Sequence, residues 1–123
     1  MQVLATKWFA KFARRERITD QQLCSAVENA ESGLISADLG DGLIKQRIAR
    51  LGQGKSSGFR VLIAYRTGER AVFVYGFAKN ERDNIGTAEL ADWRLQAADW
   101  LAADDDVLAL EIAQDGLKEI DCG

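Results

Sequence analysis

The sequence predicts one α+β domain, because its apolar residues change their period twice along the chain. Residues 7–31 carry helical spacing, residues 43–78 alternate as strands do, and helical spacing returns from residue 88. The 123 residues are enough for one compact domain, and no linker, repeat or low-complexity tract divides them. Residues 1–123 are therefore expected to form a single domain.

Two helices are expected near the N-terminus. In residues 7–15, KWFAKFARR, the aromatic residues gather on one side of a short amphipathic helix that Thr6 can cap. A second helix over about residues 20–31 begins with the capping-box spacing of Thr19 and Gln22. The SGLISADLGDG stretch that follows is rich in turn formers and predicts a loop.

Three strands are expected to form an antiparallel meander over residues 43–50, 59–66 and 69–78. Each alternates between two faces, and the last is rich in β-branched and aromatic residues. In the first strand, LIKQRIAR, Lys45 and Arg47 share one face, whereas Gln46 and Arg50 lie on the other.

The C-terminal third predicts further helix. Residues 88–102 have helical apolar spacing, and Thr87 can cap them. In residues 107–116, VLALEIAQDG, alternating apolar residues favour a strand, whereas a preceding aspartate cap and good helix formers favour a short helix. We expect the helix there, followed by a short terminal strand in residues 117–121.

Composition excludes several chemistries. The chain has no histidine, which removes Ser-His-Asp and Cys-His triads and leaves no usual set of zinc ligands. Cys24 and Cys122 do not make a disulfide framework, and we expect them to be incidental. There is no run of eighteen apolar residues and no secretory signal core, which predicts a cytoplasmic protein without a membrane span.

Positive charge is concentrated in the middle of the chain. Residues 43–82 hold nine lysines and arginines against two glutamates, a net charge of +7. The whole chain carries −3, so the remainder carries −10. These cations could simply solubilise an exposed sheet and protect its edges, but a concentrated positive field also attracts phosphate.

Four of these cations are expected to converge at one concave end of the sheet. If the first two strands pair around the loop between them, Lys45 and Arg47 approach Lys55 in the loop and Arg60 after it. Arginine can hold a phosphodiester bidentately, and lysine offers an amine that can lose its proton. The loop, GQGKSSG, lacks the pattern and the following helix of a phosphate-binding P-loop.

At these residues the chain resembles a known family. The strand pattern Lys45-x-Arg47, then GKSSGFRV, then YGFAKNERDNI, is similar to the RelE/HigB toxins of bacterial type II toxin-antitoxin modules, in the RelE/ParE superfamily. The similarity covers nearly the whole chain. It implies two N-terminal helices packed on a curved, mainly antiparallel sheet, with a further helix before a short C-terminal strand.

The resemblance also implies an activity and partners. These toxins are endoribonucleases that cleave messenger RNA, commonly on the ribosome, without a cofactor or metal. A cognate antitoxin protein neutralises them, and operator DNA is bound only by the toxin-antitoxin complex. No membrane partner is implied.

Roles for individual residues follow from that resemblance. The 2′-hydroxyl attacks the adjacent phosphorus, so the enzyme must align the reactants, stabilise added negative charge and protonate the leaving 5′-oxygen. Lys45 or Lys55 is expected to act as general base, and Arg47 and Arg60 to bind the scissile phosphate. RNA-binding roles are expected for the remaining basic residues, Arg50, Lys79 and Arg82; either of the last two would complete the anion site or assist the leaving group.

Two other functions remain open at this point. One is a ParE-like or degenerate toxin that binds a protein target or its antitoxin without cutting RNA. The other is a β-sheet RNA-binding module, which would need exposed stacking aromatics. Phe59, Phe73, Tyr75 and Phe77 fit an apolar core face better than that role.

Overall fold

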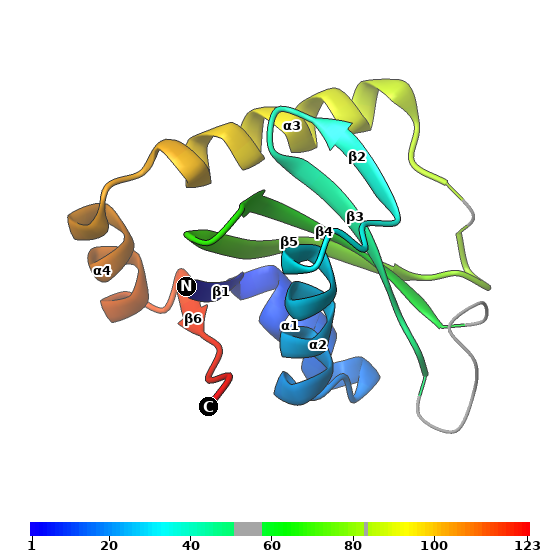
Figure 1. Ribbon diagram of the computed structural model, residues 1–123, viewed down its shortest axis with the longest axis horizontal. Coiled ribbons are helices and arrows are strands. Elements are labelled where there is room, and N and C mark those ends of the chain that lie inside the picture. Colours follow the sequence, from blue (N-terminus) through cyan, green and yellow to red (C-terminus); the bar gives the residue numbers. More distant parts are fainter. Residues whose placement is uncertain (51–57, 83) are drawn as a thin grey trace.

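The computed structural model describes residues 1–50, 58–82 and 84–123, and over these residues it is an α+β fold with four helices and one six-stranded sheet (Figure 1). The strands lie in the order β2-β3-β4-β5-β1-β6. The elements in chain order are β1 (Gln2–Thr6), α1 (Lys7–Glu16), α2 (Asp20–Glu31), β2 (Ala37–Gly40), β3 (Leu43–Ile48), β4 (Phe59–Arg66), β5 (Arg70–Ala78), α3 (Thr87–Ala102), α4 (Asp105–Ala113) and β6 (Leu117–Glu119).

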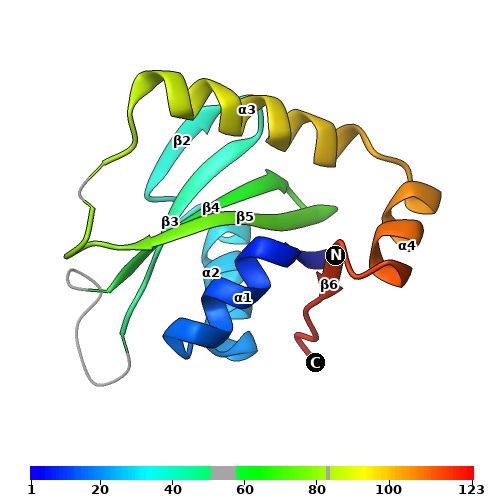
Figure 2. The ribbon, with the colours of Figure 1, turned by 180° about the vertical axis from the view of Figure 1, so that it is seen from behind.

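Helices cover both faces of the sheet. In the two views α1 and α2 lie below the sheet and α3 lies above it, with α4 at the far end of α3 (Figures 1 and 2). Val61 and Ile63 of β4 pack with α1 and α2, whereas Leu62 and Ala64 pack with α3. This two-sided burial explains why β4 is almost continuously apolar, since a strand covered on both faces needs apolar residues at every position.

The expected meander is confirmed, but two strands were not foreseen. β3, β4 and β5 pair antiparallel in sequence order. β1 pairs with β5 in parallel, so a strand precedes the two N-terminal helices. β2 forms within the segment expected to be a loop, where three residues pair with β3. β1 is short, and its distant partner β5 defines it. β2 is joined to β3 by Asp41 and Gly42, which both have positive φ, so an Asp-Gly hairpin signal was present in the segment expected to be a loop.

Most of the helix N-caps predicted from the sequence are confirmed. Thr6 accepts a hydrogen bond from the Phe9 amide at 3.2 Å, and Thr19 and Gln22 form the expected capping box. The Thr87 cap is wrong, because Gly86 takes the N-cap position and Thr87 is the first residue of α3. The preference for a short helix before the terminal strand is confirmed by α4. Two helices therefore precede β6, as the residue pattern predicted, whereas the family resemblance implied one.

The expectation that the cysteines are incidental is wrong. Cys24 of α2 is bonded to Cys122 in the C-terminal tail, across a sequence separation of 98 residues. Helix α2 packs on the sheet beside the C-terminal segment that follows β6. Only the tertiary fold brings these two positions together, and their spacing in the sequence carries no such signal.

No helix within the described ranges has both the length and the apolar character needed to cross a bilayer.

Replacing Cys122 with serine should lower the free energy of unfolding. A cross-link that closes a loop of about 100 residues restricts the unfolded chain by up to about 4.7 kcal/mol. We expect the midpoint of urea unfolding to fall in Cys122→Ser, and reductant to lower the wild-type midpoint to the same value. Equal midpoints for oxidised and reduced wild type would contradict a stabilising bond.

Candidate functional site

Two arginines lie opposite each other near the end of β3 and the start of β4. The register of β3 with β4 places Arg47 directly opposite Arg60, and Lys45 opposite Leu62 two residues away. Residues directly opposite in an antiparallel pair point to the same face, with Cα atoms about 5 Å apart. Since Leu62 packs with α3, all three cations lie on the face of the sheet that α3 covers in part.

The same row of side chains continues onto β5. Arg60 pairs with Phe77, and Leu62 pairs with Tyr75. The guanidinium of Arg82 lies 5.7 Å from the centre of the Phe77 ring and 5.8 Å from that of Tyr75. A line of cationic and aromatic side chains therefore crosses three strands, from Arg47 to Arg82.

Arg60 is held in an environment that disfavours its charge. Its side chain is only 6% exposed, and Nη1 donates a hydrogen bond to the Phe59 carbonyl at 3.3 Å. Burial, and then the like charge of Arg47, hold the pKa of Arg60 below its ordinary value. A bound anion would oppose both effects, so this pair is suited to a phosphate.

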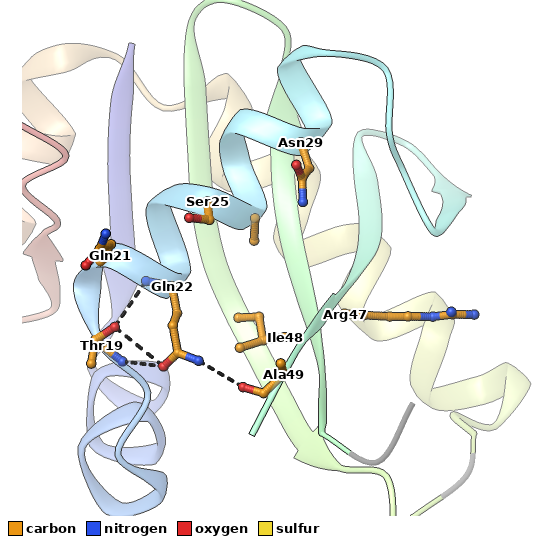
Figure 3. Close-up of a pocket in the computed structure, with 9 residues that line it drawn as sticks. Thr19, Gln21, Gln22, Ser25, Asn29, Arg47, Ile48 and Ala49 are labelled. Atoms are coloured by element: carbon orange, nitrogen blue, oxygen red, sulfur yellow. Dashed lines mark hydrogen bonds between the residues drawn. The ribbon is translucent and has the colours of Figure 1, made fainter. Parts of the chain in front are cut away.

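Arg47 is the accessible member of the pair. It is exposed, and Figure 3 shows its side chain extending away from α2. Next to it, between α2 and β3, lies a groove of about 410 Å³ whose lining includes the polar residues Gln21, Ser25 and Asn29. At the floor of this groove Gln22 donates to the Ala49 carbonyl at 2.8 Å (Figure 3). The groove offers neutral hydrogen-bonding groups beside an exposed cation.

A glycine sets the close approach of the strands at this end of the sheet. A Cβ on Gly58 would lie 2.1 Å from the Ile48 carbonyl oxygen, so no other residue fits without a backbone shift. The Gly58 carbonyl accepts a hydrogen bond from the Lys79 amide at 3.0 Å. Lys79 is exposed and is thereby placed beside the start of β4. Lys55 lies outside the described residues.

Arg82 is already engaged by protein groups. It pairs with Glu89 and donates to the Tyr75 hydroxyl at 2.9 Å and to the Asn84 carbonyl at 2.8 Å. Glu89 raises the pKa of Arg82, and the hydrogen bonds from Arg82 and then Trp93 lower the pKa of Glu89. Arg82 is therefore aimed along the same face as Arg60, but much of its charge is balanced.

The structure separates Arg50 from the other predicted site residues. Its guanidinium lies 4.7 Å from the centre of the Phe59 ring, and Phe59 contacts Phe12 of α1. Arg50 is therefore on the opposite face of the sheet from Arg47 and Arg60. This matches the strand alternation, which assigned Arg50 to the other face.

Arg70 belongs to the basic segment but has a structural role. It is buried and donates to the carbonyls of Trp100 at 2.8 Å and Ala103 at 2.6 Å, which caps the C-terminal end of α3. Arg66, at the far end of β4, pairs with Glu69. The net charge of residues 43–82 thus overstates the number of cations available to a ligand.

Glu89 is a residue of this region that the sequence did not single out, and Tyr75 was expected only on an apolar core face. Tyr75 stacks on Trp93 with ring centroids 4.8 Å apart, and Trp93 donates to Glu89 at 3.1 Å. The spacing of Glu89 and Trp93, four residues apart on a helix, was a usable signal. No spacing rule predicts the ion pair of Arg82 with Glu89, because Glu89 belongs to α3 and Arg82 precedes that helix.

The described side chains can bind and polarise a phosphate. Arg47 and Arg60 supply guanidinium donors from adjacent strands, and Lys45 supplies an amine on the same face. No group of three histidine, cysteine, aspartate or glutamate residues among the described positions is arranged to hold a metal ion.

Comparison with known proteins gives one match. A family model described as the RelE toxin of the RelE/RelB toxin-antitoxin system matches residues 1–120. Searches of curated proteins and of solved structures found no match.

Substituting Arg70 and Arg47 separately should distinguish the structural arginine from the available one. Arg70→Met leaves buried carbonyls without a donor and should lower the free energy of unfolding by about 2–4 kcal/mol. Arg47→Met removes an exposed cation that faces another cation, so stability should change by no more than about 0.5 kcal/mol. Chemical denaturation followed by circular dichroism measures both, and equal losses would contradict the assignment.

Proposed function

Because the chain belongs to the RelE toxin family, and so is the toxin of a toxin-antitoxin module with a cognate antitoxin, we propose that it is an endoribonuclease that cleaves messenger RNA. The observation that supports this most is the opposition of Arg47 and Arg60 across β3 and β4. Two guanidinium groups on one face can bind the two non-bridging oxygens of a phosphodiester.

The first task of this site is to hold the scissile phosphate and stabilise its transition state. During attack by the 2′-hydroxyl the phosphorus gains a fifth oxygen neighbour, and negative charge grows on the non-bridging oxygens. Arg47 and Arg60 would stabilise that charge more than the charge of the ground state, which is the requirement for catalysis. The partial burial of Arg60 increases the effect, because charges interact more strongly where water is excluded.

The second task is proton transfer. A lysine amine, Lys45 or Lys55, would accept the 2′-hydroxyl proton, and a new bond would form from that oxygen to phosphorus. The bond to the 5′-oxygen then breaks, and Lys79 would return a proton to it. The products are a 2′,3′-cyclic phosphate and a 5′-hydroxyl end. Arg82 would contribute positive charge at the edge of the site, and Arg50 would contact RNA only beyond it.

The setting of the reaction is part of the proposal. Translated messages are the substrate, so the protein would act in the cytoplasm and on the ribosome, and would meet operator DNA only within the toxin-antitoxin complex. Cytoplasmic thiols are normally reduced. The RNA site proposed here uses residues of β3 and β4, whereas Cys122 follows β6 at the other edge of the sheet. The proposal therefore does not depend on the Cys24–Cys122 bond being formed.

Single substitutions in the site should abolish RNA cleavage without unfolding the protein. We expect Arg47→Ala and Lys45→Met to reduce cleavage by at least about a hundredfold, because each removes a group that acts in the transition state. Arg66→Ala is the matched control, since Arg66 lies on the same strand as Arg60 but at its far end. The readout is mapping of transcript 5′ ends and growth after induced expression.

The outcomes separate the candidate functions. New 5′-hydroxyl ends within translated messages, lost in Arg47→Ala and kept in Arg66→Ala, support the ribonuclease. Growth arrest without new RNA ends would favour a ParE-like toxin with a protein target. Full cleavage by Arg47→Ala and Lys45→Met would overturn the site.

A further inference from the structure

A second groove, of about 580 Å³, lies between the start of α1 and the helices α3 and α4. All three tryptophans of the chain line it: Trp8 from α1, and Trp93 and Trp100 from α3. Val74 of β5 and Val107 of α4 also line it. We call this surface the tryptophan groove. Figure 2 shows α1, α3 and α4 framing the end of the sheet where it lies.

The tryptophan groove exposes apolar surface that the fold does not bury. Trp8 is 47% exposed and Val107 is 45% exposed. The indole nitrogen of Trp100 is buried without a hydrogen-bond partner among the described residues. Tryptophan is the residue most enriched at the energetic centres of protein interfaces, so three together on an open groove indicate a docking site.

The rings of the tryptophan groove are held in place before any partner arrives. Trp8 stacks on Phe12, with ring centroids 5.5 Å apart, and contacts Tyr75 at 5.0 Å. Trp93 stacks on the same Tyr75 and donates to Glu89. A preformed groove loses little conformational entropy on binding, which favours affinity.

Charge identifies the kind of occupant. Residues 87–115, which form α3, α4 and their connections, hold eight acidic residues and one arginine, a net charge of −7. Asp99 lines the tryptophan groove, and Asp92, Asp104 and Asp106 are exposed on the same two helices or at their ends. Lys7 lines the groove at its α1 end. An apolar groove within an acidic surface fits apolar side chains flanked by lysine or arginine.

The described helices of a second copy of this chain do not offer such a segment. Its own cationic amphipathic helix is α1, which carries Lys7 and Lys11. The apolar side of α1 is already used, because Phe9 and Phe12 are buried in the core. Among the described elements this leaves no matching segment in a second copy, which favours another protein as the occupant.

We propose that the tryptophan groove binds a cationic amphipathic segment of the cognate antitoxin. The inference rests on membership in a toxin-antitoxin family and does not require RNA cleavage. Two or three apolar side chains of the segment would pack on Trp8, Trp93 and Val107, and its cations would face the aspartates of α3 and α4. Trp93 touches Tyr75 and Glu89, both partners of Arg82, so the occupant would lie beside the RNA site without covering Arg47 or Arg60.

Designed peptides test the chemistry of the occupant directly. The probe is an amphipathic peptide of about 18 residues with leucines on one helical face and lysines on the other. The control peptide keeps the leucines and replaces every lysine with glutamate. Because every tryptophan of the chain lines the groove, intrinsic fluorescence reports occupancy. The lysine peptide should shift the emission and bind at least about tenfold more tightly than the glutamate peptide, and more weakly as salt rises.

Two pairs of variants locate the binding. Val107→Lys should weaken the lysine peptide at least about tenfold, whereas Leu110→Lys should not, since Leu110 is 56% exposed on the same helix but does not line the groove. Asp99→Lys should weaken it as well, with Glu28→Lys as the control, since Glu28 is exposed on α2, which does not line the groove. Circular dichroism confirms that each variant is folded, and the second pair decides if one variant of the first does not fold.

The last experiment uses the antitoxin itself. Co-expressed with the antitoxin of its module, the tagged Val107→Lys chain should retain much less antitoxin than the tagged Leu110→Lys chain. Equal retention, equal binding of the two peptides, or no fluorescence change would overturn the proposal. Because none of these readouts uses RNA, failure of the ribonuclease proposal with intact peptide binding would leave this inference standing, and the reverse holds too.

Discussion

The direct opposition of Arg47 and Arg60 is the contact on which the candidate site depends. Like charges opposite each other in a sheet are unfavourable, and here one of them is also buried. The surrounding structure holds them there: β4 is packed on both faces, and Gly58 lets its first residues lie against the end of β3. A site that keeps two cations close in the absence of ligand is organised in advance for an anion, which is the arrangement that electrostatic catalysis needs.

The sequence allowed most of the regular elements to be predicted, because their signals are local. The capping box of Thr19 and Gln22 and the alternation in β3 and β4 depend only on near neighbours. β1 and the Cys24–Cys122 bond depend on distant partners, so no local pattern predicts them. β2 pairs with the next strand, β3, and the Asp-Gly turn between them was a local signal that the expectation of a loop missed. The same division applies to the site. Strand alternation placed Lys45 with Arg47, but charge counting could not tell that Arg70 caps a helix or that Arg82 is paired.

Positive and negative charges are concentrated in different parts of the chain, and the structure places them on different surfaces. Lys45, Arg47 and Arg60 lie on the β3 and β4 end of the sheet, whereas α3 and α4, which line the tryptophan groove, carry many acidic residues. Tyr75 lies between the two, in contact with Trp93 on one side and Arg82 on the other. A toxin with this division can attract phosphate locally while it carries a net charge of −3.

The most direct test of the central claim is the salt dependence of RNA binding. A short RNA with the 2′-hydroxyl groups replaced by 2′-O-methyl cannot be cleaved, so affinity can be measured at several salt concentrations. If Arg47 binds a phosphate beside Arg60, Arg47→Ala should weaken binding and reduce the slope of log K against log salt by about 0.7, the value for one contact to a single strand. An unchanged affinity and slope would contradict the account.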